Sequence, residues 1–310
     1  MSATRLLEID DLTPAEFTAL LDTASAWKAD PSAVPPLLAG QGAALIFEKP
    51  SARTRASTEM AVVGLGGHPI YIRGEEVGIG VRETVPDVAR TYASFCAVIA
   101  ARVFDHTTLE EMAAVSPVPV VNLLSDRAHP LQAVADFLTL RELCGTLEGR
   151  RLVYVGDGNN VAASLAFGAA MTGVELTVAS PPGYELDELV VSQARNLGGH
   201  VELTTDPHEA VRDADAVYTD VWTSMGQEEE TALRVAAFEG YTVDEDLMAA
   251  AGEQAWFLHC LPAHRGEEVS AGVIDGPRSA VWQQAANRMD AARAALAHVL
   301  RADSLSVGGE

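Results

Sequence analysis

Short apolar segments alternate with longer segments of helical periodicity along most of the chain. Each apolar segment is rich in Val, Ile and Leu at consecutive positions, a pattern typical of strands buried on both faces of a parallel sheet. The predicted strands are residues 44–48, 69–72, 97–103, 118–122, 151–155, 175–179, 200–203, 216–219, 256–258 and 280–282. The predicted helices are residues 54–64, 130–144, 161–172, 187–197 and 283–302.

This alternation predicts a doubly wound α/β fold, in which helices connect parallel strands and cover both faces of the sheet. The chain has 310 residues, more than one hydrophobic core usually supports, so we expect two such domains with a crevice between them. A polar, glycine-containing connection at residues 145–150 marks the boundary. The predicted domains are residues 1–145 and 150–282, followed by the helix at 283–302.

Acidic residues outnumber basic ones by 44 to 21, which gives a net charge of -23 and a pI near 4.6. A surface of this charge repels nucleic acids and anionic membranes, so neither is an expected partner. Because 48% of the residues are hydrophobic, the chain can build a core, and its carboxylates must lie on the surface of a folded body. We hypothesise a protein from a high-salt cytoplasm; a moderately acidic mesophilic enzyme is the alternative.

No apolar stretch approaches the roughly 20 residues that span a bilayer, and the N-terminus lacks the charged and apolar regions of a signal peptide. The sequence therefore predicts a soluble, cytoplasmic protein. Its three cysteines, Cys96, Cys144 and Cys260, are not spaced in pairs, which argues against a disulfide framework and against a cysteine zinc site. We expect reduced thiols and no metal.

A candidate anion site follows the first predicted strand. Ser51 begins a helix there, so the free backbone N–H groups of the next residues point out of the positive end of that helix. Arg53 and Arg55 add forked donors suited to phosphate oxygens, and Thr54 adds a hydroxyl. The alternative is a serine cap followed by two exposed arginines.

Three further polar residues lie where an α/β sheet binds its ligand. Arg102 is at the end of a predicted strand, where a parallel sheet presents side chains to the ligand crevice. His129 precedes Pro130 at the start of a helix, and Gln132 lies three residues further on, so both side chains can face one ligand. The alternatives are a strand-end surface charge and a histidine cap on a surface helix.

Residues 156–160, Gly-Asp-Gly-Asn-Asn, connect a strand to a helix in the manner of a dinucleotide-binding loop. Val161 stands where the third glycine of that fingerprint belongs, and no acidic residue is well placed on the following strand. We therefore favour an amino-acid site, in which Asn160 offers a donor and an acceptor to an α-carboxylate or α-amine. A nucleotide-dependent oxidoreductase is the alternative.

Asp220 and Cys260 also lie at the ends of predicted strands. The carboxylate of Asp220 suits a substrate ammonium group, and Ser224 and Met225 follow on the same connection. Free cysteines usually only pack inside a protein. The position of Cys260 among polar residues at a strand end nevertheless favours a functional role.

The run from Phe257 to Gly266 resembles the His-Cys-Leu-Pro signature of the ornithine carbamoyltransferase family. The resemblance continues, in the family's order, over nearly the whole chain. It is carried by residues 51–55 (Ser-Ala-Arg-Thr-Arg), 129–132 (His-Pro-Leu-Gln) with Asp136, 157–160 (Asp-Gly-Asn-Asn), 220–226 (Asp-Val-Trp-Thr-Ser-Met-Gly) and 287–289 (Asn-Arg-Met). Ala52 replaces the family's usual threonine, at a position that the family uses through its backbone N–H.

This resemblance implies transfer of the carbamoyl group from carbamoyl phosphate to the side-chain amine of L-ornithine, without a cofactor, by a homotrimer or a higher assembly of trimers. The first domain, with the C-terminal helix packed on it, would bind carbamoyl phosphate, and the second would bind ornithine. The residues implied to bind carbamoyl phosphate are Ser51, Ala52, Arg53, Thr54, Arg102, His129, Gln132, Cys260, Leu261 and Arg288. The residues implied to bind ornithine are Asn160, Asp220, Ser224 and Met225. The residues implied to act in catalysis are Arg102, His129, Asp220 and Cys260.

The resemblance leaves several readings open. Putrescine, acetylated ornithine and aspartate are rival acceptors within the family, although aspartate would need cations at the Asp220 loop. Cys260 is expected to orient the attacking amine and not to act as a covalent nucleophile. A catalytically inactive binding or regulatory protein with the same fold is the remaining alternative.

Overall fold

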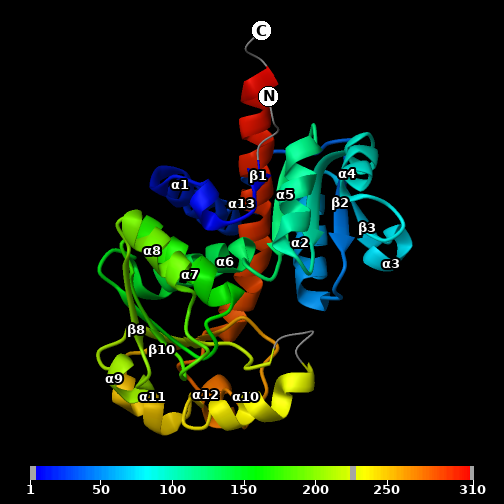
Figure 1. Ribbon diagram of the computed structural model, residues 1–310. Coiled ribbons are helices and arrows are strands. Elements are labelled where there is room, and N and C mark those ends of the chain that lie inside the picture. Colours follow the sequence, from blue (N-terminus) through cyan, green and yellow to red (C-terminus); the bar gives the residue numbers. More distant parts are fainter. Residues whose placement is uncertain (1–4, 224–227, 308–310) are drawn as a thin grey trace. The chain divides into compact units, whose positions relative to one another are not determined.

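The computed structural model describes residues 5–223 and 228–307, and the chain forms two compact units. The first unit comprises Met1–Val134 and Arg288–Glu310, and the second comprises Ala135–Asn287. Each unit contains a five-stranded parallel sheet with helices on both faces (Figure 1). The predicted fold class, doubly wound α/β in two parallel-sheet domains, is confirmed.

In the first unit the strand order is β1-β5-β4-β2-β3, and neighbouring strands are parallel. The strands are β1 (Arg5–Leu6), β2 (Gly42–Phe47), β3 (His68–Arg73), β4 (Cys96–Arg102) and β5 (Val120–Leu124). Five of the six residues of β2 are buried, because this strand has a neighbour on each edge and helices on both faces.

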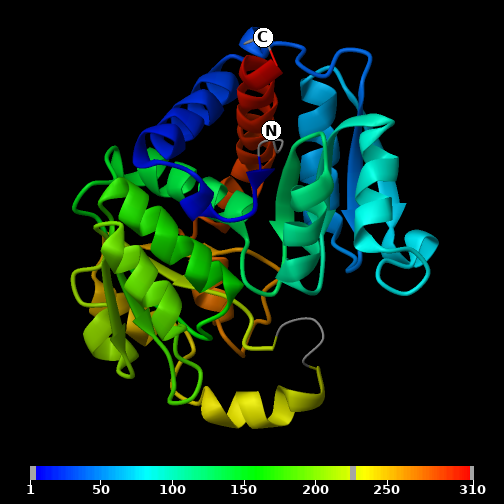
Figure 2. The same ribbon diagram turned by 45° about the horizontal axis from the view of Figure 1, so that its top comes forward.

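The helices of the first unit cover opposite faces of its sheet. The chain passes from β2 through α2 to β3 and then returns across β2 to β4, so right-handed connections place α2 on one face and α4 and α5 on the other (Figure 2). The helices are α1 (Pro14–Ala29), α2 (Ala52–Gly64), α3 (Gly74–Val77), α4 (Val85–Ala93) and α5 (His106–Val115), with 3-10 turns η1 (Ile9–Asp11) and η2 (Pro31–Ala33).

In the second unit the strand order is β10-β9-β6-β7-β8, again parallel throughout. The strands are β6 (Arg151–Val155), β7 (Glu175–Ala179), β8 (His200–Thr204), β9 (Ala216–Thr219) and β10 (Trp256–His259). The remaining helices are α6 (Pro130–Cys144), α7 (Asn160–Thr172), α8 (Glu188–Asn196), α9 (Pro207–Ala210), η3 (Glu228–Glu230), α10 (Thr231–Ala237), α11 (Glu245–Ala251), α12 (Ala271–Ile274) and α13 (Val281–Val307).

Helices α6 and α7 pack closely because Gly168 has no side chain. A Cβ atom at Gly168 would lie 2.1 Å from the ring of Phe137, which is far inside van der Waals contact. The first turn of α6 and the part of α13 that begins at Arg288 belong to the first unit. Arg288 donates a hydrogen bond of 2.8 Å to Thr54 of α2, so the C-terminal helix packs on the first unit as the resemblance implied.

One predicted strand is wrong. Residues 280–282 form the end of a connection and the start of α13, because the chain makes a single bridge to β10 and then turns. Ala280 donates its N–H to the carbonyl of Phe257, and its own carbonyl accepts the first helical bond, from Gln284. The helix therefore begins at Val281 and continues to Val307, beyond both predicted ends. The short strand β1 was not predicted.

The other nine predicted strands and the four internal helices are present, with ends that differ by a few residues at most. Among the described residues, no helix combines the length and the apolar composition that crossing a bilayer requires.

Candidate active site

In the first unit, the carboxyl ends of β2 and β4 border the point where the strand order reverses. The chain leaves β2 toward β3 on one side and later reaches β4 on the other side. Connections that diverge in this way leave a crevice at the strand ends, where α/β proteins bind ligands. Ser51 follows β2 and Arg102 ends β4, so the topology brings these two predicted residues to the same edge of the sheet.

Ser51 caps α2 and organises its first turn. Its backbone is extended, with φ -158°, and its Oγ accepts the N–H of Thr54 at 3.4 Å. The same hydroxyl donates to Thr54 Oγ1 at 3.0 Å, and Arg288 Nη2 donates to that oxygen at 2.8 Å. The positive end of a helix of 13 residues therefore lies beside a buried guanidinium, an arrangement suited to an anion.

The two arginines of this turn have different surroundings. Arg55 donates to Glu59 at 2.8 Å and stacks over the ring of Tyr71, with 3.7 Å between the guanidinium carbon and the ring centroid. Arg53 is exposed at the start of the helix, beside the exposed Ala52. Arg53 is therefore the better candidate for a substrate contact.

Four buried polar residues complete this first cluster: Arg102, His129, Gln132 and Arg288. Complete burial, together with the positive charges of Arg288 and Arg102, holds the pKa of His129 well below its ordinary value. The imidazole is therefore neutral at physiological pH, while the two guanidiniums are charged. Two cations and a neutral imidazole suit the oxygens of an anionic substrate, and Gln132 adds an amide.

The second unit has its own topological switch, between β6 and β9. The chain leaves β6 toward β7 on one side, and β9 lies on the other side. The predicted loop at residues 156–160 follows β6, and Asp220 follows β9. Cys260 follows β10, the neighbour of β9, so three predicted segments meet at one edge of this sheet.

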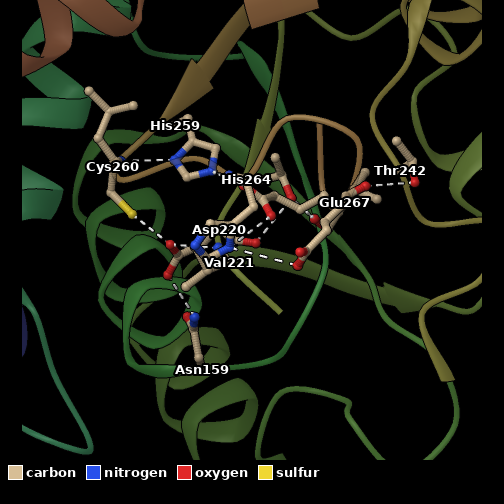
Figure 3. A network of polar contacts seen from close by, with 12 residues as sticks. Asn159, Asp220, Val221, Thr242, His259, Cys260, His264 and Glu267 are labelled. Atoms are coloured by element: carbon tan, nitrogen blue, oxygen red, sulfur yellow. Dashed lines mark hydrogen bonds and ion pairs between the residues drawn. The ribbon is translucent and has the colours of Figure 1, made fainter. Parts of the chain in front are cut away.

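Asp220 is the centre of this second cluster (Figure 3). Cys260 Sγ donates to Asp220 Oδ1 at 2.8 Å, and Asn159 Nδ2 donates to Oδ2 at 2.9 Å. The N–H of Val221 also donates to Oδ1, at 2.8 Å. Asp220 is 6% exposed, so these three donors replace water around its carboxylate.

The glycine-rich loop does not offer a free phosphate cradle. The N–H of Gly158 donates to the carbonyl of Tyr184 at 2.8 Å, and a Cβ atom at Gly158 would lie 2.3 Å from the backbone of Leu186. Asn159 caps α7 by accepting the N–H of Val161 at 2.9 Å. Gly158 therefore serves close packing, and Asn160 begins the helix at the edge of the cluster.

Arg234 is a buried residue of this region that sequence reasoning missed. Its Nη1 donates to Asp157 at 2.8 Å and to the carbonyl of Trp222 at 3.0 Å, and its Nε donates to Glu230 at 3.1 Å. Burial raises the pKa of Asp157, and the charge of Arg234 opposes that shift. The sequence motif contains Asp157, but nothing in the sequence around Arg234 identifies this arginine as the partner of Asp157.

Ser224 and Met225, both predicted to bind ornithine, lie outside the described residues. Leu261 follows Cys260 with φ 59°, a left-handed conformation that is unfavourable for a leucine. Cys260, His259 and Asp220 bring possible metal-ligating atoms within 4.8 Å of one another. Both ring nitrogens of His259 already have hydrogen-bond partners in Leu261 and Glu268, so this histidine is poorly suited to a metal.

Comparison with known proteins gives concordant matches over both units. A model described as aspartate/ornithine carbamoyltransferase, carbamoyl-P binding domain, matches residues 4–142. A model described as aspartate/ornithine carbamoyltransferase, Asp/Orn binding domain, matches residues 148–299.

Similar whole proteins carry a related description. The ornithine carbamoyltransferase of Acidothermus cellulolyticus is 51% identical, over 94% of this chain and 95% of its own. The structure of ornithine carbamoyltransferase from Pyrococcus furiosus is 45% identical with a TM-score of 0.92, covering 97% of this chain and 98% of its own. The structure from Thermus thermophilus is 46% identical with a TM-score of 0.88, covering 96% and 98%.

Proposed function

Because the chain belongs to the aspartate/ornithine carbamoyltransferase family, we propose that it transfers the carbamoyl group of carbamoyl phosphate to the side-chain amine of L-ornithine. The products are L-citrulline and phosphate. The observation that carries the choice of acceptor is the buried carboxylate of Asp220 with its two side-chain donors. A carboxylate attracts the ammonium end of ornithine and repels the second carboxylate of aspartate.

In this proposal the first unit binds carbamoyl phosphate. The phosphate lies at the start of α2, against Ser51, the N–H of Ala52, Arg53 and Thr54. The remaining contacts polarise the carbamoyl group and are made by Arg102, His129 and Arg288 to oxygens and by Gln132 to the carbamoyl nitrogen. Preorganised donors of this kind stabilise the oxyanion that develops in acyl transfer.

The second unit binds ornithine. Asn160 holds the α-amino-acid group, and Ser224 and Met225 complete that contact. Asp220, Cys260 and the carbonyl of Leu261 orient the side-chain amine, which must be neutral to attack. The neutral amine nitrogen forms a bond to the carbamoyl carbon, and the bond from that carbon to the phosphate oxygen breaks. The nitrogen then gives up one proton, which the leaving phosphate takes up. The rate should therefore rise with pH until the bound amine is mostly deprotonated.

The reaction needs no redox step and no electrophilic cofactor, because carbamoyl phosphate is already activated. Holding two reactants in line can by itself contribute about 7 to 11 kcal/mol. We further propose that residues 1–145 with the helix at 283–302 form the carbamoyl phosphate domain and residues 150–282 the ornithine domain. A cytoplasmic homotrimer, alone or in a larger assembly of trimers, is the proposed working form.

A panel of acceptors tests this function directly. The purified protein is incubated with carbamoyl phosphate and ornithine, putrescine, N-acetylornithine or aspartate, and the ureido product is measured. Ornithine should give the highest kcat/KM. Equal use of putrescine would contradict the assignment of an α-amino-acid site, and the absence of product with every acceptor would favour an inactive relative. Binding of NAD in a parallel titration would support the nucleotide alternative.

A further inference from the structure

All the polar atoms of the His259 side chain have specific hydrogen-bond partners. His259 ends β10, directly before Cys260, and is 1% exposed. Its Nδ1 accepts the N–H of Leu261 at 2.8 Å, and its Nε2 lies 3.1 Å from Glu268 Oε1. Its backbone N–H donates to Gln284 Oε1 at 2.9 Å. The residue is therefore fixed from both its ring and its backbone.

These partners determine where the imidazole carries its proton. The N–H of Leu261 is a donor, so Nδ1 must present a lone pair, and the proton of the neutral ring is on Nε2, where it donates to Glu268. Glu268 is completely buried, and its Oε1 also accepts the N–H of His264 at 2.5 Å. A buried carboxylate on one nitrogen thus selects the tautomer that accepts on the other.

The bond to Nδ1 is made by a residue with an unfavourable backbone. Leu261 is left-handed, with φ 59°, and its bond to His259 fixes the orientation of the peptide plane between Cys260 and Leu261, from which that conformation starts. Cys260 lies between the two bonded residues, so the same contact restricts the direction of its side chain. Cys260 Sγ then meets Asp220 Oδ1 at 2.8 Å (Figure 3).

The backbone of His259 is fixed by a second buried set of contacts. Gln284 Nε2 donates to Asp136 Oδ1 at 2.6 Å, and Tyr218 donates its hydroxyl to Asp136 Oδ2 at 3.1 Å. The carboxylate determines which way the amide of Gln284 faces, and the amide oxygen is therefore left for the N–H of His259. Asp136 belongs to the segment that follows the His129 motif and has no place in the substrate contacts proposed above.

We propose that His259 is a positioning residue for the amine acceptor. Its Nε2–H tautomer, selected by Glu268, holds the peptide plane between Cys260 and Leu261 and thereby aims the Cys260 thiol and the Leu261 carbonyl at the ornithine amine. His259 itself touches no substrate. This inference rests on the proposed carbamoyl transfer and adds to it a reason for the histidine of the His-Cys-Leu-Pro signature.

Two substitutions at the same position separate the two ring nitrogens. In His259→Asn the amide oxygen can replace Nδ1 as the acceptor for Leu261, whereas in His259→Gln the amide nitrogen replaces Nε2 and the acceptor is lost. We expect His259→Gln to lower kcat/KM for ornithine on the order of 10- to 100-fold. His259→Asn should stay within about threefold of the parent, and the KM for carbamoyl phosphate should change in neither variant.

Glu268→Gln tests the selection of the tautomer. Its amide can donate to Nε2 as well as accept from it, so the ring proton is no longer confined to one nitrogen. Imidazole nitrogen shifts in ¹⁵N-histidine-labelled protein should show Nε2–H alone at His259 in the parent and a share of Nδ1–H in Glu268→Gln. The His259 signals are assigned by their loss in His259→Asn, and the exposed His208→Gln serves as the matched control.

The outcomes distinguish positioning from simple structural support. If His259→Gln and His259→Asn lose activity equally, in step with their melting temperatures, the proposal is wrong. A parent protein with Nδ1–H at His259 would also overturn it, and this measurement needs no substrate and only one folded variant, His259→Asn or His259→Gln, for the assignment. Failure of the proposed function is a separate result, because the parent itself would then form no ureido product.

Discussion

Cys260 donates a hydrogen bond of 2.8 Å from its thiol to Asp220 Oδ1, across 40 residues of sequence. A thiol that donates to a carboxylate carries its proton, whereas a nucleophilic cysteine needs the thiolate, which positive neighbours stabilise. The pair therefore favours the orienting role that we propose for Cys260 over a nucleophilic one, and it joins the ends of β9 and β10 at the proposed acceptor site.

Cys260→Ser should keep a donor to Asp220 but shorten its reach. We expect kcat/KM for ornithine to fall on the order of 10-fold, because the hydroxyl cannot place its proton where the longer C–S bond did. The melting temperature should stay near that of the parent. Cys144→Ser is the control, since this cysteine lies at the end of α6, away from the proposed acceptor contacts. If both variants had the kinetics of the parent, Cys260 would have no role in orienting the amine.

Arg53→Gln should weaken the use of carbamoyl phosphate. The substitution removes a charged donor at the exposed start of α2, and we expect a loss of at least ~2 kcal/mol of transition-state stabilisation, measured from kcat/KM for carbamoyl phosphate. Arg55→Gln is the matched control, because Arg55 pairs with Glu59 and Tyr71. Equal losses in the two variants would show that the helix charge, and not a specific contact of Arg53, matters.

Arg234→Met should destabilise the second unit. The side chains of Arg234 and Asp157 are 9% and 13% exposed, so the substitution leaves a carboxylate without its cation in a poorly hydrated place. Breaking such a pair from one side costs about 3 to 5 kcal/mol, measurable by urea unfolding. Arg265→Met removes the exposed pair with Asp275 and should cost about 1 kcal/mol or less. Similar losses in both variants would argue against the buried pair.

Stability should decrease as the pH falls below 6.5. The pKa values of His129, His106 and His298 are all lowered from 6.5, chiefly by burial. These histidines therefore bind protons near pH 6.5 in the unfolded chain, but only at a lower pH in the folded protein. Each group can reduce the unfolding free energy by up to about 1.4 kcal/mol per pH unit within that window. In His129→Gln the unfolding free energy, measured by urea unfolding, should fall less steeply between pH 6.5 and 5.5 than in the parent. An unchanged slope would show that His129 has the same pKa in the folded and unfolded states.

The melting temperature should climb from dilute buffer to molar potassium chloride. Surface carboxylates repel one another at the net charge of -23, and the screening length falls from about 10 Å at 0.1 M salt to about 3 Å at 1 M. Salt also competes with carbamoyl phosphate for Arg53 and Arg102, so the apparent KM for that substrate should rise. A flat or falling melting curve would show that the acidity is not an adaptation to high salt.

The sequence alone predicted the position of those candidate residues that depend on adjacent residues in the chain. Ser51 was recognisable because a cap and its helix lie within four residues, and Asp220 because it directly follows an apolar strand. The strand predicted at residues 280–282 is wrong because three apolar residues in a row fit the first turn of a helix as well as a strand.

Other contacts depend on partners that no local pattern reveals. Arg234 meets Asp157 over 77 positions, and Gln284 meets Asp136 over 148. The tautomer of His259 follows from Glu268 and Leu261 together, which is a property of the folded chain. Such residues supply the support around the candidate site, and the sequence alone showed mainly the groups proposed to face substrate.

Helix α13 also bears on how the protein is made. Gln284 bonds to Asp136 in the second unit, and Arg288 bonds to Thr54 in the first, over 234 positions. During synthesis neither of these two contacts can form until residues 281–288 have left the ribosome. The first candidate cluster thus stays without Arg288 for nearly the whole of translation, although all five strands of its sheet, which end at Leu124, are made early. The nascent chain can therefore expose unfinished, aggregation-prone surfaces until its last helix is made.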